Sequence, residues 1–113
     1  MAMQTRRLIV PVAFDAGVKV PDGYGGDEVS WQEAFRTRAE FRYESGRESV
    51  DGGGLTGTAV FKVRIRTQVS AEGLTMDHRM RDLIRGIAFN IREIDRVTDR
   101  LFIWLVVEKG VAL

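Results

Sequence analysis

The segment from Met80 to Lys109 constrains the fold of this 113-residue chain more than any other. Apolar residues at 87–91 alternate with small and polar ones, and a period of two is the pattern of a β-strand with one buried face. A polar run at 96–100 predicts a turn, and an uninterrupted apolar run at 101–107 follows it. We therefore expect consecutive antiparallel strands joined by tight turns, the last of them covered on both faces.

Residues 6–14 are expected to form a first strand, and two further stretches, at 29–43 and 58–69, show the same alternation. Pro11 favours an edge position for the first, because proline has no backbone N–H to donate to a neighbouring strand. Residues 15–28 are rich in Gly, Pro and Asp and predict a long turn. Strands separated by turn clusters are typical of all-β domains. We therefore expect a mainly β fold, a small antiparallel β-barrel or sandwich of about six strands.

The segment 44–57 is expected to be a long flexible loop. Three successive glycines provide no side chain to pack and leave the backbone many conformations. A short helix over 46–51, ended by Gly52, is the alternative, so the fold has at most one short helix. The residues that mark this loop are Ser45, Gly46, Arg47, Glu48, Gly52, Gly53 and Gly54.

The composition excludes most catalytic chemistry. The chain has no cysteine and a single histidine, which removes disulfides, cysteine–zinc sites and thiol nucleophiles. The glycine-rich run at 52–58 lacks the lysine of a phosphate-binding loop. The longest apolar run is far shorter than the ~20 residues of a membrane-spanning helix. We expect one domain over 1–113, with no catalytic, cofactor-binding or metal site and no membrane partner.

Four large apolar residues are candidates for an interface between subunits. Phe102, Trp104 and Val106 share one face of the strand at 101–107, and Trp31 lies near the start of the strand at 29–43. The alternative is that they form the core of a closed domain. The sequence leaves both possibilities open.

Nucleic-acid binding by a small barrel is a second functional hypothesis. Arginines project from the strands at 29–43 and 58–69, and such a platform needs aromatic rings on the same face. Alternation places Phe41, Tyr43 and Phe61 on the opposite face. The net charge of +1 also lacks the strong positive bias of a nucleic-acid-binding protein.

Six motifs follow one another in a fixed order along almost the whole chain. A basic strand at 6–14 is followed by Asp22-Gly23-Tyr24-Gly25-Gly26 and then by Trp31. Next come Ser45-Gly46-Arg47-Glu48, the arginine-rich strand around 62–66 and the closing segment 80–109. This order resembles that of the head–tail joining proteins of tailed bacteriophages, also called head-closure, head-completion or stopper proteins. Relatives of that family occur in gene transfer agents.

The resemblance implies a structural protein of the virion, made in the bacterial cytoplasm, and not an enzyme. It implies a β-barrel protomer that assembles as a ring of 12 or 6 copies, with the portal or adaptor protein above and the tail terminator or tail tube below. Such a ring extends the DNA channel, retains the packaged genome, passes double-stranded DNA without reading its sequence, and docks the tail. The 44–57 segment occupies the position of the loop associated with gating. Another connector, such as a tail terminator, is the nearest alternative.

Overall fold

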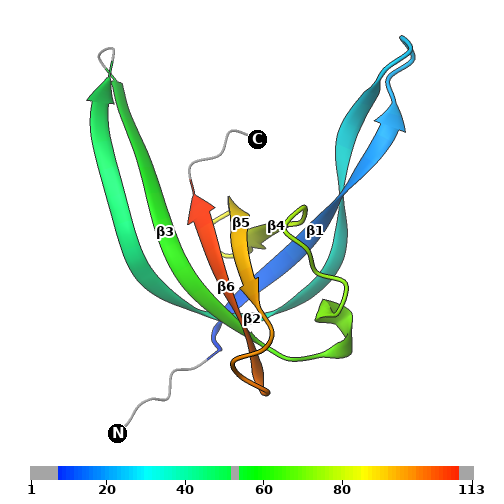
Figure 1. Cartoon of the computed structure of the whole chain (residues 1–113). Helices are drawn as coiled ribbons and strands as arrows, with labels where there is room; N and C mark the ends of the chain where they lie inside the picture. The colour runs from blue at the N-terminus through cyan, green and yellow to red at the C-terminus, as the bar shows by residue number, and fades with distance from the viewer. Residues whose placement is uncertain (1–7, 52–53, 110–113) are drawn as a thin grey trace, which may run out of the picture.

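Six antiparallel strands close into a barrel in the computed structural model (Figure 1). The structure describes residues 8–51 and 54–109, with the side chains of 44–51 and 54–58 left out of the description. The barrel order is β1-β2-β3-β6-β5-β4, and a 3₁₀ turn, η2 (Val69–Ala71), is the one helical element among the described residues. The strands are β1 (Val10–Pro21), β2 (Asp27–Asp51), β3 (Gly54–Arg66), β4 (Arg79–Asp82), β5 (Ile87–Asp95) and β6 (Phe102–Lys109). The predicted mainly β fold of about six strands is confirmed, as a barrel.

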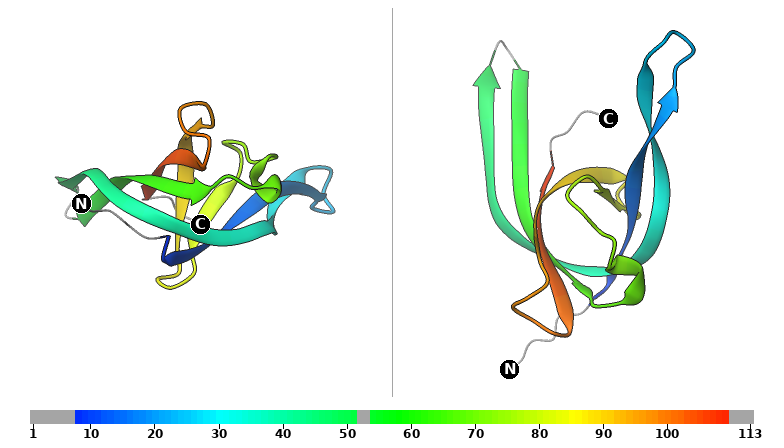
Figure 2. Two further views of the ribbon diagram at one scale, coloured as in Figure 1. Left: turned by 90° about the horizontal axis from the view of Figure 1, so that it is seen from below. Right: turned by 45° about the vertical axis from the view of Figure 1, so that its right-hand side comes forward.

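Two hairpins extend beyond the barrel. β1 pairs with β4 only over Val12–Asp15, whereas its pairing with β2 continues to Pro21 and Asp27. β2 and β3 likewise remain paired as far as Asp51 and Gly54, although β3 pairs with β6 only from Ala59 onward. We call these extensions the β1–β2 arm and the β2–β3 arm. Both leave the same end of the barrel, while η2 and the β5–β6 turn lie at the opposite end (Figure 2).

The arms explain the extended shape of the molecule. Its radius of gyration is 15.8 Å, against about 13 Å for a compact chain of this length. Its principal extents are 57 × 41 × 25 Å. A large part of the hairpin backbone therefore lies away from the barrel core, where it is open to other molecules.

Three sequence-based predictions about these hairpins are wrong. The turn expected over 15–28 is confined to 22–26, because the flanking residues continue the β1–β2 pairing. The backbone expected as a loop over 44–57 instead extends β2 and β3, and the alternative helix at 46–51 is not formed; Gly52 and Gly53 lie outside the described residues. β1 is not an edge strand, since β2 and β4 flank it. Pro11 stands near its start, where a missing donor costs least.

The core fills the barrel with side chains from all six strands. Phe14 is fully buried and stacks on Phe35 with ring centroids 4.9 Å apart, and Phe61 and Phe89 meet edge-on at 5.8 Å. The loop around η2 adds Ala71 and Leu74 to this core. Other buried members are Val12, Ala39, Val63, Ile65, Met80, Ile91, Ile103, Leu105 and Val107. The period-two pattern therefore selected the inward faces correctly.

One arginine connects the loop around η2 to the β5–β6 turn, at the end of the barrel opposite the arms. Arg96, in the β5–β6 turn, donates from Nη1 to the carbonyl of Ala71 at 2.9 Å and from Nη2 to the carbonyl of Leu74. These bonds satisfy carbonyl groups of a segment that lacks regular pairing. No helix within the described ranges has the length and apolar character needed to span a bilayer.

Candidate interaction surfaces

The outer face of β6 is covered by cationic side chains. Phe102, Trp104 and Val106 are half-buried and point away from the barrel core, whereas the residues between them are buried in it. Arg64 lies over the ring of Phe102, 4.1 Å from its centroid, and Lys62 lies 5.4 Å from the centroid of Trp104. The sequence predicts that this strand is covered on both faces, and the two faces are covered by different groups. One face is covered by the core, and the other by charged groups in cation–π contact.

The same cations form part of a larger basic face on β2 and β3. The strand register places Glu40 beside Arg64 and Arg42 beside Lys62. Glu40 lies in the middle of this face and pairs with Arg64 at 2.5 Å. The basic residues of the face are Arg38, Arg42, Lys62, Arg64 and Arg66.

The basic face changes one part of the nucleic-acid hypothesis. Phe41 and Phe61 pack with the core, as alternation predicts. However, β6 brings Phe102 and Trp104 to the side of the arginines, which the separate sequence segments did not reveal because the β3–β6 pairing is long-range. The contacting guanidinium and ammonium groups occupy the side of those rings on which a base would stack. The arrangement therefore favours a protein contact over a nucleic-acid platform.

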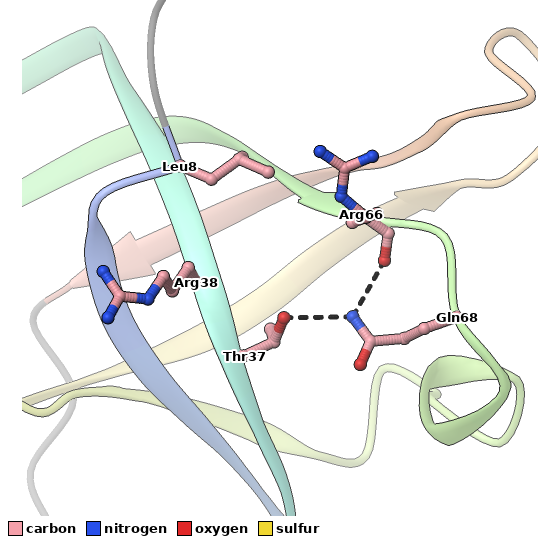
Figure 3. A pocket seen from close by; sticks show the side chains of 5 residues that line it. All are labelled: Leu8, Thr37, Arg38, Arg66 and Gln68. Carbon is pink, nitrogen blue, oxygen red and sulfur yellow. Dashed lines mark hydrogen bonds between the residues drawn. The ribbon is translucent and has the colours of Figure 1, made fainter.

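A hollow of about 480 Å³ lies at one end of the basic face (Figure 3). Its lining residues are Leu8, Thr37, Arg38, Arg66 and Gln68. Gln68 Nε2 donates to Thr37 Oγ1 at 3.0 Å and to the carbonyl of Arg66 at 2.9 Å. These two bonds hold the Gln68 side chain in place on one side of the hollow. The two guanidinium groups point away from each other in Figure 3. No carboxylate of the described residues forms an ion pair with either of them. We call this site the arginine hollow.

A polar network stands where the β1–β2 arm joins the barrel. Asp15 is only 2% exposed, beside a bulge in the β1–β2 register. Its Oδ2 accepts from Arg79 Nε at 2.8 Å and from Arg81 Nε at 2.6 Å, and its Oδ1 accepts from Arg81 Nη2 at 3.0 Å. Arg81 Nη2 also donates to Glu33, which pairs with Arg36. These ion pairs connect β4 to the arm and so fix its direction.

Trp31 belongs to this network and is not part of the core. It is 40% exposed, and the guanidinium of Arg79 lies 4.5 Å from the centroid of its ring. Trp31 pairs across the arm with Gly17, where a Cβ would lie 3.6 Å from its ring. The glycine leaves the strand surface open beneath the indole. Trp31 thereby stiffens the base of the arm while keeping part of its ring in solvent.

The Asp15 pair makes stability depend on acid pH. Burial raises the pKa of Asp15, but hydrogen bonds and charges from Arg81 and Arg79 outweigh it, so that this pKa lies below its ordinary value. The unfolded chain thus takes up the proton first. The stabilisation is complete above about pH 5 and is lost as the pH falls from about 3.9 through the folded pKa. Urea unfolding at several pH values should show this loss.

Asp15→Asn is the control for that measurement, because it removes this titrating group and leaves the others. Glu33 and Asp95 also have lowered pKa values, mainly through hydrogen bonds from Arg36 and Thr98 respectively. Both proteins should therefore lose stability in acid, the variant less steeply. Equal slopes below pH 4 would contradict the assignment to Asp15.

The tip of the β1–β2 arm is a rigid acidic turn. Asp22 Oδ1 accepts from the N–H groups of Tyr24 at 2.7 Å and Gly26 at 3.1 Å, and the Asp22 N–H donates to the Gly26 carbonyl at 3.0 Å. Gly23 and Gly25 have φ angles of +85° and +89°, a region that L-residues rarely adopt. Tyr24, between them, is 93% exposed. We call residues 22–28 the acidic tip, since its charged residues are Asp22, Asp27 and Glu28.

The predicted channel segment has a defined backbone position. Ser45, Gly46, Arg47 and Glu48 lie in β2 on the β2–β3 arm, and Gly54 begins β3. Their assignment to a channel remains a prediction, as does the assignment of Trp31, Phe102, Trp104 and Val106 to a subunit interface. Among the side chains that the structure describes, at 8–43 and 59–109, no three from His, Asp or Glu are grouped as a metal site would require.

Comparison with known families identifies the chain. The model of the family described as phage head completion protein matches residues 3–110. The chain belongs to the phage head completion protein family. A head completion protein is a structural component of a phage or gene-transfer-agent particle and not an enzyme. This membership confirms the resemblance inferred from the order of motifs.

Solved structures support the fold of this head completion protein. A chain in the virion of a native gene transfer agent particle matches with a TM-score of 0.72 and 22% identity, covering 96% of this chain and all of that chain. A Shigella flexneri 2a protein studied in solution matches with a TM-score of 0.70 and 15% identity, covering 98% of this chain and all of that one. No curated protein matches the sequence. At these identities the structural likeness concerns the fold.

Proposed function

We propose that this head completion protein is a ring-forming connector between the head and the tail. Its ring lies below the portal or adaptor protein, extends the DNA channel, helps to retain the packaged genome and offers a docking surface to the tail. The observation that carries this proposal is the family match over residues 3–110. The gene-transfer-agent virion chain of the same fold supports a place within a particle.

The surfaces of the protomer suit such a role. A ring subunit needs two different contact surfaces, because each copy meets one neighbour on either side. The arms and the basic face provide unlike surfaces on one chain. The β2–β3 arm, which carries the Ser45–Glu48 motif, is the part that we assign to the channel. With a net charge of +1, the subunit has little overall attraction for passing DNA.

Removal of the chain from particle-producing cells tests this function. Without it, we expect filled heads to lose their DNA to added nuclease and to remain without tails, and the wild-type chain supplied in trans should restore both properties. Electron microscopy of the restored particles should show a ring of 12 or 6 copies beneath the portal. Tailed, nuclease-resistant particles formed in its absence would contradict the proposal.

A further inference from the structure

We propose that the acidic tip of one subunit docks at the arginine hollow of the next subunit in the ring. The occupant is thus residues 22–28 of a second copy of this chain. The inference rests on the ring proposed above and specifies which two surfaces form the contact between copies.

The charges of the two surfaces are complementary. The arm from residue 16 to residue 32 carries Lys19 as its single basic residue and three acidic residues, all in the tip, for a net charge of −2. The hollow has Arg38 and Arg66 at its rim, and neither forms an ion pair with a described residue. A guanidinium group attracts a carboxylate and matches its geometry, so each arginine of the hollow suits one carboxylate of the tip. The contact would pair carboxylates of the tip with two arginines that form no ion pair among the described residues.

Tyr24 is presented as an anchor for this contact. Two hydrogen bonds to Asp22 hold the turn in shape, so little conformational entropy is lost when the ring of Tyr24 becomes buried. Tyrosine is among the residues that most often dominate binding energy at protein interfaces. The hollow offers its ring an apolar wall at Leu8 and guanidinium groups able to form cation–π contacts.

The geometry excludes the same contact within one chain. Leu8 precedes the first residue of β1, and the tip begins after its last residue, Pro21. The twelve-residue strand places the hollow and the tip at opposite ends of the hairpin, roughly 35 Å apart along β1. The tip itself stands about 20 Å beyond Asp15, where β4 pairing ends. Contact between two unlike surfaces of identical subunits is the head-to-tail type that closes rings.

Site-specific photo-crosslinking in assembled particles tests the contact. Benzoylphenylalanine placed at position 24 should, on irradiation, link two copies of the chain. Mass spectrometry should place the link at residues 37–38 or 66–68 of the second copy. The same probe at Val97 serves as the control. Val97 is 90% exposed in the β5–β6 turn, outside the proposed contact, so it should not link two copies of the chain at these residues.

The other outcomes overturn the inference and separate it from the proposed function. Links from position 24 to DNA, to a different particle protein or to other residues of this chain would show another occupant. Particles that contain the subunit but give no link from position 24 would equally contradict the docking. Absence of the chain from purified particles would contradict the connector function itself.

Discussion

Asp15→Ala is expected to lower the free energy of unfolding by about 3–5 kcal/mol, the usual cost of removing one partner of a buried ion pair. Asp15 is 2% exposed, and the side chains of Arg79 and Arg81 are only 16% and 31% exposed. Without the carboxylate, two cations would remain close together with few protein acceptors. Urea unfolding at pH 7, followed by circular dichroism, measures the loss.

Asp77→Ala is the matched control for this variant. Asp77 is exposed in the loop before β4, and its carboxylate forms no ion pair with a described residue, so its removal should change the free energy of unfolding by less than about 0.5 kcal/mol. A loss at Asp15 of the same small size would show that Arg79 and Arg81 reach water once the carboxylate is gone. The network would then not determine the stability of the arm base.

Alternation of apolar and polar residues predicted the barrel but not the arms. A strand inside the barrel buries one face, so its pattern is imposed by the core, as in Ile103, Leu105 and Val107. An arm has no such core, and its sequence is free to contain glycine and aspartate. Gly17 resembles a turn residue in the sequence, yet it lies in β1 because Trp31 covers it from the opposite strand. Cross-strand partners of this kind cannot be identified before the register is known.

The candidate interaction surfaces were also only partly predictable. The structure places four large apolar residues partly exposed outside the core, namely Trp31, Phe102, Trp104 and Val106. Their covering cations come from other strands, more than 30 residues away in the case of Arg64 and Trp104. The buried position of Asp15 was not predicted, although a carboxylate directly after the apolar run ending at Phe14 is a signal for a buried ion pair. Its partners lie 64 and 66 residues further along the chain.

Charge reversal at either surface of the proposed ring contact should abolish tailed particles. Asp27→Lys combined with Glu28→Lys gives the tip a positive charge, and Arg38→Glu combined with Arg66→Glu gives the hollow a negative one. Like charges brought together across an interface cost several kcal/mol, and about 3 kcal/mol corresponds to a hundredfold or greater loss of affinity at each contact. All four positions are exposed, so each purified variant should unfold at nearly the wild-type urea concentration.

A chain that carries all four reversals decides whether the two surfaces meet. Its positive tip again faces a negative hollow on the next copy, and therefore it should restore tailed particles that neither double variant forms.

A mixture of the two double variants provides a second test of the contact. A reversed tip attracts a reversed hollow, and an unchanged tip attracts an unchanged hollow. A ring made from both variants can therefore close only when the two alternate around it. Two tip-reversed copies repel each other, because the positive tip of one would meet the unchanged, positive hollow of the other. A tip-reversed copy must therefore have hollow-reversed copies as its neighbours. In that alternation a reversed tip meets a reversed hollow on one side, and an unchanged tip meets an unchanged hollow on the other. Mixed expression should accordingly restore particles when the ring has an even number of copies, as rings of 12 or 6 do. Failure of both the four-reversal chain and the mixture, with folded protein present, would mean that the tip and the hollow bind elsewhere.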